Sequence, residues 1–530
     1  MELIRCTVGE MLAHTAARYP QSCAIEYMGK QYSYLWLDGE TDRLACGLLA
    51  LGVQKGDHIG IWANDRPQTL LCYYAMEKIG AVPVMLGTSL HPREVAQLLA
   101  EADVQYLFFD EGFKGTSFVD ACRGEAFAGL RRLVYIGPGS AFHFCTLGTL
   151  LAEGEHIAQP ALAAAKAAVS PDDIDVILFT SGTTGSPKGV LTTHYSRVNN
   201  ARAHAVAMEM GPEDKICVAI PMFHCFCLSS NLLAALSVGA CVCYPPNRRT
   251  ETLLRTIEKS GCTVFSTVPT LFSALIARND LDSFNLSSLR VGIIGGALYE
   301  ASFYQSVCDA LRYDLRPSLG QTEATAGFTI GNSFDPLSVK ARTVGHFMEH
   351  IEHCIKDITT GEPLPPGEAG DICIRGYSVM QGYYKQPELT KQIIDAEGWL
   401  HTGDVGYLDE RGNLRLTGRV KELIIRAGEN IAPAEIERIL EQDPRIARAK
   451  AVGVPDKHYG EEICACIVPA DDTTLTADEV RLLVSERLAA FKVPRYVVFL
   501  KEFPLSGSNK VMLHKLKDMA VKALRESNWQ

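Results

Sequence analysis

A run of small polar residues between Thr180 and Lys188 holds side chains suited to binding phosphate. It follows a short apolar segment, 174–179, that reads as a buried strand. Glycines let the backbone approach a ligand, hydroxyls donate hydrogen bonds, and the lysine adds a positive charge. The residues that we expect to contact phosphate are Thr180, Ser181, Gly182, Thr183, Thr184, Gly185 and Lys188. Taken alone, the segment is also compatible with a plain linker, and it is not a Walker loop because no Gly-Lys-Ser/Thr triplet occurs.

Further segments place an imidazole and carboxylates along the chain. Pro221-Met-Phe-His224 sets an imidazole beside an aromatic ring, Leu319-Gly-Gln-Thr-Glu323 offers a hydroxyl and a carboxylate, and His401-Thr-Gly-Asp404 ends in a second carboxylate. A carboxylate can hold a hard cation such as Mg²⁺, or accept hydrogen bonds from two neighbouring sugar hydroxyls. A lone histidine is more often a satisfied core residue, so these segments gain weight only together.

In their order along the chain, these segments resemble the motifs of the adenylate-forming superfamily, over roughly residues 8–517. That superfamily includes acyl-CoA synthetases, adenylation domains of nonribosomal peptide synthesis and beetle luciferases. The resemblance implies that Thr322 contacts phosphate, that Glu323 holds Mg²⁺ and that His224 lies beside the acyl pocket. It also implies a set of nucleotide contacts, which are Gly295, Gly296, Ala297, Leu319, Gly320, Gln321, Asp404 and Arg419.

The same resemblance implies roles for three residues near the C-terminal end. Lys421 occupies the hinge position, where a residue absorbs a backbone rotation as domains turn. Gly428 would let a pantetheine arm pass, and Lys510 would contact the carboxylate and the α-phosphate during adenylation. We therefore expect five residues to carry the chemistry, namely Lys510, Lys188, Thr322, Glu323 and His224.

Three positions depart from the superfamily pattern. Cys227 stands where glycine is common, Leu319 replaces an aromatic residue that stacks on adenine, and Asn509 replaces the glycine before Lys510. Adenine should therefore be held by shape and dispersion. The region after His224 lacks the aspartate that amino-acid-activating relatives use for the α-amine, which favours an acid without an amine.

The implied reaction has two steps. A carboxylate attacks the α-phosphorus of ATP and gives acyl-AMP and pyrophosphate, and a thiol then takes the acyl group and releases AMP. We expect coenzyme A as the thiol and a lipophilic acid as the substrate, with a medium-chain fatty acid ahead of aryl or alicyclic acids. The alternatives are an adenylating enzyme that loads a separate acyl carrier protein, a catalytically silent nucleotide-binding homologue and a luciferase-like oxidase.

Strand-like runs that alternate with amphipathic helical segments must position these residues. Strand-like runs include 58–62, 81–86, 106–109, 217–220, 263–268 and 290–294. The alternation indicates an α/β fold with layered parallel sheets, in which Pro83 makes its strand a candidate for an edge position. Past Leu319 the pattern becomes hairpin-like and suggests a small β-barrel-like portion. We expect an N-terminal AMP-binding domain over 1–418 and a small mobile α+β domain over 419–530.

Composition bounds the class of protein. The 530 residues carry a net charge of −11, which excludes a general affinity for nucleic acid or for anionic membranes. The 17 cysteines include no Cys-x-x-Cys pair, and Cys225/Cys227 and similar i, i+2 pairs would share one face of a strand as buried apolar residues. The N-terminus lacks a signal pattern, and no apolar run suits a membrane span. We expect a cytoplasmic monomer or homodimer.

Overall fold

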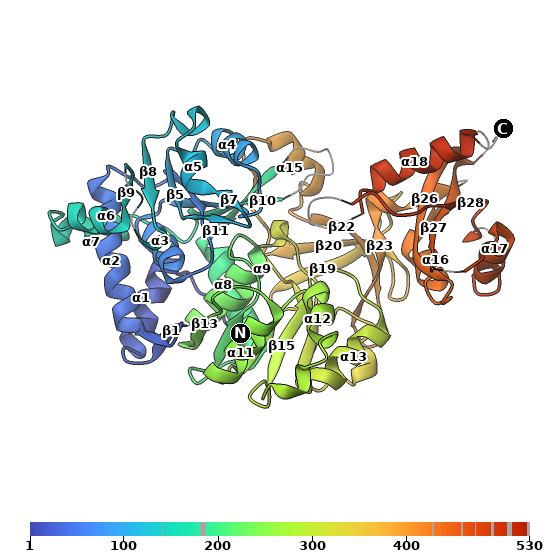
Figure 1. The fold of residues 1–530 in the computed structure, drawn as a ribbon, viewed down its shortest axis with the longest axis horizontal. Coiled ribbons are helices and arrows are strands. Elements are labelled where there is room, and N and C mark those ends of the chain that lie inside the picture. The colour runs from blue at the N-terminus through green and yellow to red at the C-terminus, as the bar shows by residue number, and fades with distance from the viewer. Residues whose placement is uncertain are drawn as a thin grey trace. The chain divides into compact units, whose positions relative to one another are not determined.

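The computed structural model describes residues 1–139, 141, 143–180, 187–426, 429–456, 459–471, 473–488, 492–505 and 511–526. The chain divides into two compact units (Figure 1). Unit 1 comprises Met1–His353 and Ile374–Leu400, and unit 2 comprises Cys354–Cys373 and His401–Gln530. Segments 354–373 and 401–418, which precede the boundary expected from the sequence, are thus part of unit 2. The boundary at 418/419 and the hinge at Lys421 stay predictions.

Eight of the described strands form the first sheet of unit 1. In spatial order they are β21 (Gly382–Tyr383), β11 (Lys188–Thr193), β10 (Ile174–Thr180), β4 (Val82–Met85), β3 (His58–Trp62), β5 (Tyr106–Phe109), β8 (Arg132–Tyr135) and β9 (Cys145–Thr146). The strands from β10 to β9 run parallel, whereas β11 is antiparallel to both β10 and β21. A core that includes Trp62, Phe109 and Phe118 packs on this sheet.

The expected edge position of Pro83 is wrong, because β4 lies between β10 and β3. Val82 donates its backbone N–H to Asp57 on the β3 side at 2.8 Å. Successive backbone groups point in opposite directions, so the Pro83 nitrogen faces β10, where pairing begins only at Val84. The missing N–H therefore costs this central strand no ladder bond.

Seven of the described strands form the second sheet of unit 1. In spatial order they are β16 (Asp314–Ser318), β15 (Val291–Gly295), β14 (Val264–Ser266), β12 (Lys215–Val218), β13 (Cys241–Tyr244), β1 (Cys23–Tyr27) and β2 (Lys30–Ser33). The strands from β16 to β1 are parallel, and their carboxyl ends therefore meet at one edge. Short hairpin-like pairs are β6 (Gly112–Phe113) with β7 (Thr116–Ser117), and β17 (Thr329–Ile330) with β18 (His346–Phe347).

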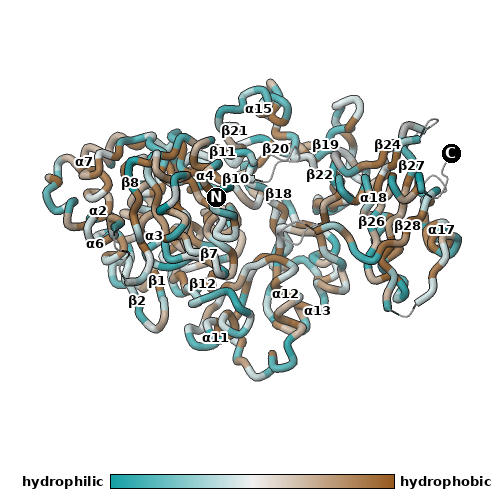
Figure 2. Tube along the Cα trace, turned by 45° about the horizontal axis from the view of Figure 1, so that its top comes forward, coloured by the Kyte–Doolittle hydropathy of each residue, from teal (hydrophilic) through white to brown (hydrophobic). Residues whose placement is uncertain are grey.

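Helices cover the sheets of unit 1. They are α1 (Val8–Arg18), α2 (Tyr34–Ala50), α3 (Pro67–Ile79), α4 (Pro92–Glu101), α5 (Phe118–Cys122), α6 (Leu147–Gly154), α7 (Gln159–Ala167), α8 (His194–Ala207), α9 (Cys225–Cys227), α10 (Ala234–Val238), α11 (Thr250–Ser260), α12 (Pro269–Ile276), α13 (Ala301–Leu311), α14 (Leu337–Lys340) and α15 (Pro387–Ile393). Helix α3 begins with a proline and ends at Gly80, whose φ of 70° suits a glycine stop. Every residue of α3 except Gln68 is buried, whereas α15 has no buried residue and is largely hydrophilic in Figure 2.

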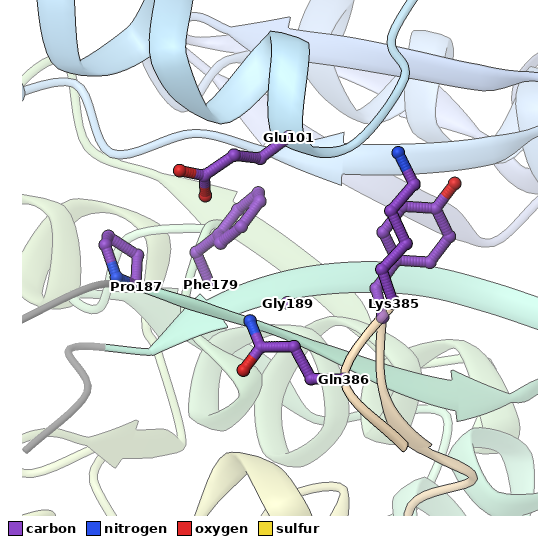
Figure 3. A pocket seen from close by; sticks show the side chains of 7 residues that line it. Glu101, Phe179, Pro187, Gly189, Lys385 and Gln386 are labelled. Atoms are coloured by element: carbon purple, nitrogen blue, oxygen red, sulfur yellow. The ribbon is translucent and has the colours of Figure 1, made fainter. Parts of the chain in front are cut away.

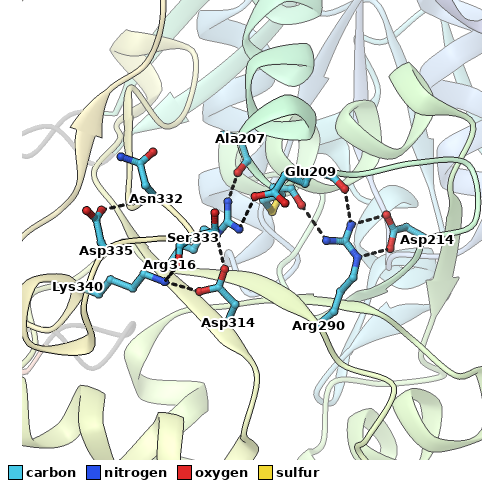
Figure 4. Close-up of polar contacts among 11 residues, drawn as sticks. Ala207, Glu209, Asp214, Arg290, Asp314, Arg316, Asn332, Ser333, Asp335 and Lys340 are labelled. Carbon is cyan, nitrogen blue, oxygen red and sulfur yellow. Dashed lines mark hydrogen bonds and ion pairs between the residues drawn. The ribbon is translucent and has the colours of Figure 1, made fainter.

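Two arginines bind the carboxyl end of α8 (Figure 4). Arg290 donates to the Met208 carbonyl at 3.0 Å and to Asp214 at 2.9 Å. Arg316 donates to the Ala207 carbonyl and, at 2.7 Å, to Asp314. Cations at this end compensate the helix dipole and the unpaired carbonyls, so the pair fixes α8 on the second sheet.

Unit 2 holds most of a sheet with the strand order β19 (Ile351–Lys356), β20 (Gly370–Gly376), β22 (Leu400–Leu408) and β23 (Leu414–Arg419). Its other described strands are β25 (Glu429–Ile431), β24 (Ile424–Arg426), β27 (Gly460–Pro469) and β26 (Ile446–Asp456), with β28 (Tyr496–Phe499) beside β27. Its helices are α16 (Pro433–Leu440), α17 (Ala477–Ser485) and α18 (Leu513–Glu526). A capping box formed by Thr476 and Glu479 starts α17. Among the described residues, no helix combines the length and apolar character that a bilayer crossing requires.

Candidate active site

The expected phosphate loop joins β10 to β11. Thr180 ends β10 and stands opposite Lys188, which begins β11, in the antiparallel register of the two strands. Lys188 is 7% exposed, so its charge is held inside unit 1. The other expected loop residues, Ser181, Gly182, Thr183, Thr184 and Gly185, lie outside the described residues. The two strand ends bring the first and last expected phosphate contacts together.

Tyr383 connects Lys188 with Glu323. The Lys188 ammonium lies 5.2 Å from the centre of the Tyr383 ring, and the Tyr383 hydroxyl donates to Glu323 Oε1 at 2.7 Å. Burial raises the pKa of Tyr383 well above its usual range, and the Glu323 carboxylate raises it further. The phenol therefore stays a proton donor to that carboxylate. Pairing between β21 and β11 sets this geometry, because Tyr383 stands opposite Val190.

Thr322 lies beside the segment that carries His224. The Thr322 hydroxyl donates to the Cys225 sulfur at 3.7 Å. His224 precedes α9, is exposed, and lies next to the Phe223 ring with 4.5 Å between ring centres. Residues 225–227 are helical, so the expectation that Cys225 and Cys227 share a strand face is wrong. A π-helix, Leu228–Leu233, follows directly, a feature that often occurs at functional sites.

The chain turns sharply after Glu323. Thr325 has φ 68° and ψ −47°, and the Ala326 N–H donates to the Ala324 carbonyl at 2.8 Å, which makes a γ-turn centred on Thr325. This conformation is strained for a β-branched residue. The Thr325 hydroxyl donates to the Ser378 carbonyl at 2.6 Å. The turn directly follows the short helix Thr322–Ala324 that presents Glu323.

Three expected segments lie at the carboxyl ends of strands in the second sheet. Gly295 ends β15 opposite Ser318, which ends β16 and precedes Leu319. The segment with His224 follows β12 of the same sheet. Open parallel sheets bind ligands at this edge. The expected nucleotide contacts at this edge are Gly295, Gly296, Ala297, Leu319, Gly320 and Gln321.

Asp404 and Arg419 face each other in unit 2. They are partners in the β22–β23 register, and Arg419 Nε lies 2.9 Å from Asp404 Oδ1. The Asp404 side chain is 7% exposed and the Arg419 side chain 63% exposed. Burial raises the pKa of Asp404, and the Arg419 charge opposes that rise. A buried carboxylate beside an exposed guanidinium can accept from ribose hydroxyls while the arginine offers donors to the same sugar.

Asp371 orients the segment before Asp404. Its carboxylate lies 2.7 Å from His401 Nδ1 and accepts from the Gly403 N–H at 3.3 Å. The Asp404 N–H in turn donates to the Thr402 hydroxyl at 3.1 Å. These contacts fix the backbone that presents the Asp404 carboxylate.

Three expected residues are described only in part or not at all. Lys421 lies in the short helix Val420–Glu422, and its side chain is outside the described set. Gly428 and Lys510 lie outside the described residues. Their roles stay predictions.

A cavity of about 210 Å³ lies against β10 and β11, on the face opposite to the Lys188 side chain (Figure 3). Its lining includes Phe179 and Gly189, which are register partners one position away from Thr180 and Lys188. Side chains alternate between the faces of a strand, so this cavity and the Lys188 ammonium lie on opposite faces. The cavity is therefore separate from the side chain of Lys188, the expected phosphate contact.

Sequence reasoning missed several residues that hold the site. It assigned no role to Tyr383, Arg197 or Thr325. The sequence does contain a signal for Arg197. Both Arg197 and Asp175 are charged residues in segments whose other residues are compatible with burial. The positive φ of Thr325 could not be predicted from the sequence, because threonine is not a residue type that favours it.

Comparison with known proteins identifies the family. The AMP-binding enzyme family model matches residues 12–384, and the model of the AMP-binding enzyme C-terminal domain matches residues 435–510. The protein YngI of Bacillus subtilis (strain 168), whose name describes it provisionally as an acyl-CoA synthetase, is 34% identical and is covered, like this chain, over 100% of its length. The mitochondrial medium-chain acyl-CoA ligase ACSF2 of Danio rerio is 31% identical over 98% of this chain and 89% of its own.

Solved structures agree. The crystal structure of ATP-bound MatB from Rhodopseudomonas palustris matches with a TM-score of 0.82 and 25% identity, over 97% of this chain and 99% of that one. The expected α/β class, with a large N-terminal and a small C-terminal domain, is confirmed, and so is the resemblance to the adenylate-forming superfamily. The chain therefore belongs to the AMP-binding enzyme family and, within it, to the acid–thiol ligases known as acyl-CoA synthetases.

Proposed function

We propose that this protein is an AMP-forming ligase that joins a lipophilic carboxylic acid to coenzyme A, with a medium-chain fatty acid as the favoured substrate. The observation that carries the proposal is the cluster of Lys188, Tyr383 and Glu323 beside the Thr322–Cys225 contact. It places a cation, a carboxylate and a hydroxyl beside the segment of His224. The name of the Danio rerio relative, a medium-chain acyl-CoA ligase, supports a medium-chain fatty acid as the substrate.

In the adenylation step the protein mainly positions and neutralises charge. Lys188 would attract the phosphate oxygens of ATP, with the hydroxyls of Thr180 and the following loop. Thr322 would donate to the same phosphates. Asp404 and Arg419 would hold the ribose, while the small residues Gly295 to Ala297 leave room for the base. Lys510 would approach the acid and the α-phosphate.

Glu323 fits the expected role of a Mg²⁺ ligand. Its carboxylate is half-buried and oriented by the Tyr383 hydroxyl, and a carboxylate held in this way is an oxygen donor that suits a hard cation. When bound, Mg²⁺ would neutralise charge on the phosphates. The chain's own part is to hold the carboxylate oxygen in place.

The acyl chain would lie near His224 among apolar groups. Phe223 is half-buried beside it, and Met222 and Cys227 are buried. The Met222 N–H donates to Asp65 at 3.1 Å, and Arg248 pairs with Asp65, which anchors the backbone of this segment. Such surroundings favour an acid with a hydrocarbon tail.

Thioester formation would follow a turn of the C-terminal domain about Lys421. That turn would withdraw Lys510 and present Gly428 to the pantetheine arm, a closure logic that builds two sites in turn. The cysteines are all free thiols, which is compatible with a reducing compartment such as the cytoplasm.

The test is AMP release by the full chain with ATP, Mg²⁺ and CoA, across acids from acetate through long fatty acids to benzoates. We expect CoA-dependent AMP formation to peak with medium-chain fatty acids. A peak with benzoates would overturn the substrate assignment and keep the ligase. AMP release that requires an acyl carrier protein in place of CoA would establish the alternative. ATP binding with no AMP from any acid or thiol would indicate a silent homologue.

A further inference from the structure

An ion pair is fully buried beside the strands β10 and β11. Arg197 of α8 and Asp175 of β10 are both 0% exposed, and Arg197 Nε lies 2.8 Å from Asp175 Oδ2. Removing two charges from water costs more than a pair usually returns, unless further hydrogen bonds satisfy both groups. Such a pair is therefore weak evidence for stability alone, and its other contacts show what it arranges.

The remaining donors of Arg197 reach three separate segments. Nη2 donates to the Thr192 hydroxyl of β11 at 2.6 Å, and that hydroxyl donates to Asp175 Oδ1 at 2.6 Å. Nη1 donates to the Ser229 hydroxyl at 3.0 Å and to the Thr325 carbonyl at 3.1 Å. Thr192 belongs to the strand that begins at Lys188, Ser229 to the π-helix after His224, and Thr325 to the γ-turn after Glu323.

The contact to Thr325 bears on the strained turn. A γ-turn at a threonine persists only when its surroundings over-determine it. Arg197 fixes its carbonyl and Ser378 fixes its hydroxyl. The planar guanidinium reaches several acceptors in fixed directions, which a lysine ammonium on a flexible stem does not reproduce.

We propose that Arg197 is a positioning residue for adenylation, which sets Glu323 and the segment of His224 relative to Lys188 by holding three segments at once. The proposal rests on the proposed function. Arg197 touches no reacting group in this assignment and acts through the Thr325 turn and the π-helix. Its loss should therefore impair the step that uses Glu323 more than the step that follows.

The first variant is Arg197→Lys, which keeps a positive charge beside Asp175 and loses the fork that joins Ser229 to Thr325. The second is Asp175→Asn with Arg197→Met, which removes both charges of this pair together, so that neither partner is left as an unpaired charge. The matched control is Arg290→Met, which breaks the pair with Asp214 at the far end of α8 (Figure 4). Within the described part of the chain, the side-chain hydrogen bonds of Arg290 go to Met208, Glu209 and Asp214, which lie outside the three segments.

The readouts separate positioning from folding. Acyl-AMP formation is followed by pyrophosphate release, thioester formation from supplied acyl-AMP is followed separately, and thermal unfolding is followed for each variant. Arg197→Lys and the double variant should lower kcat for acyl-AMP formation about ten- to hundred-fold, the range for a lost charge-assisted bond at a site. The rate of thioester formation from supplied acyl-AMP should change by less than about threefold in the same variants. Arg290→Met should lower the unfolding temperature and leave kcat unchanged.

Thr325→Gly supplies a rescue test. Glycine adopts positive φ without strain, so the turn should depend less on Arg197 in this background. We expect the loss in kcat for acyl-AMP formation caused by Arg197→Lys to be at least severalfold smaller in the Thr325→Gly background. Equal losses in both backgrounds, or equal losses in the two half-reactions, would overturn the proposal.

Wild-type activity decides the proposed function independently, because it requires no variant. If the wild type releases no AMP, MgATP binding still tests Arg197. Arg197→Lys should then raise the dissociation constant of MgATP severalfold, with no change in Arg290→Met. An unchanged constant in both would overturn the positioning role.

Discussion

At the residue scale, the hydrogen bond from Tyr383 to Glu323 should determine how well the Glu323 carboxylate is oriented for its proposed role as a Mg²⁺ ligand beside the ATP phosphates. Tyr383→Phe keeps the ring beside Lys188 and removes the donor that lies 2.7 Å from Glu323. A hydrogen bond to a charged group contributes about 1.5–3 kcal/mol, so we expect kcat/KM for ATP to fall by about tenfold or more. The Mg²⁺ concentration for half-maximal activity should rise as well. Pyrophosphate release at varied ATP and Mg²⁺ measures both.

The neighbouring tyrosine is a matched control. The Tyr384 hydroxyl donates to Asp103, also at 2.7 Å, but at an exposed position of the loop. Tyr384→Phe should therefore leave the kinetics unchanged. If both variants lose activity alike, the effect belongs to the loop and Glu323 has no special dependence on Tyr383.

Asp404 should impose an acid limit on nucleotide binding. Burial raises its pKa above that of an ordinary aspartate, so it takes up a proton while most carboxyls are still charged. The protonated form accepts fewer hydrogen bonds from ribose, and kcat/KM for ATP should therefore fall as pH is lowered through this raised pKa. A group whose pKa is raised by folding stabilises the folded state as it protonates, so the fall should precede unfolding.

Arg419→Gln sharpens the pH test. The Arg419 charge lowers the pKa of Asp404, so its removal should shift the acid limb of the profile to higher pH. Circular dichroism at each pH checks that the fold persists. An acid limb that does not move in Arg419→Gln would show that another group sets it.

At the element scale, β15 and β16 approach so closely that Gly295 has no room for a side chain. A Cβ at Gly295 would lie 2.8 Å from the Ser318 carbonyl oxygen. Gly295→Ala should push the strand ends apart, at a cost of about 1–3 kcal/mol, and should raise KM for ATP because Leu319 follows directly. Thermal unfolding and ATP kinetics report the two effects.

Gly39→Ala serves as the comparison. Gly39 lies in α2 with no atom within 4 Å of an added Cβ, so alanine should stabilise the helix by about 0.5–1 kcal/mol. The contrast separates a general response to glycine replacement from a close approach of strands. A Gly295→Ala variant as stable and as active as wild type would contradict the packing argument.

The elements that sequence periodicity predicted best are those with uninterrupted apolar runs. The runs 58–62 and 106–109 coincide with β3 and β5. Pro83 misled the prediction because the direction of its missing N–H is a property of register, which composition does not encode. Cys225 and Cys227 were misplaced because a spacing of two residues does not by itself show that the segment is a strand, and here it is helical.

The candidate site was predictable where a motif names the residue, and less so where a neighbour orients it. Lys188, Glu323 and Asp404 follow from the superfamily resemblance. Tyr383 reaches Glu323 only through the pairing of β21 with β11, across a separation of 60 residues in sequence. Such long-range register arises from tertiary packing, so a local pattern does not reveal it.

At the scale of the whole molecule, the residues that the sequence predicts to contact the nucleotide include members of both compact units. Lys188 and Glu323 belong to unit 1, whereas Asp404 and Arg419 belong to unit 2. With a net charge of −11, the chain must hold polyanionic ATP through such local cations. The division is compatible with a reaction whose two steps need different sets of groups.

Lys510 tests that two-step logic. We expect Lys510→Ala to lose acyl-AMP formation by about 100-fold or more, because a cation at the developing charge contributes several kcal/mol. Thioester formation from supplied acyl-AMP should persist, since the proposed turn of the C-terminal domain would withdraw this lysine from the acyl group. Lys515→Ala is the matched control, because Lys515 is exposed on α18 and should be neutral in both steps. Equal losses of the two steps in Lys510→Ala would mean that one arrangement of the domains serves both, and the hinge proposed at Lys421 would then have no catalytic role.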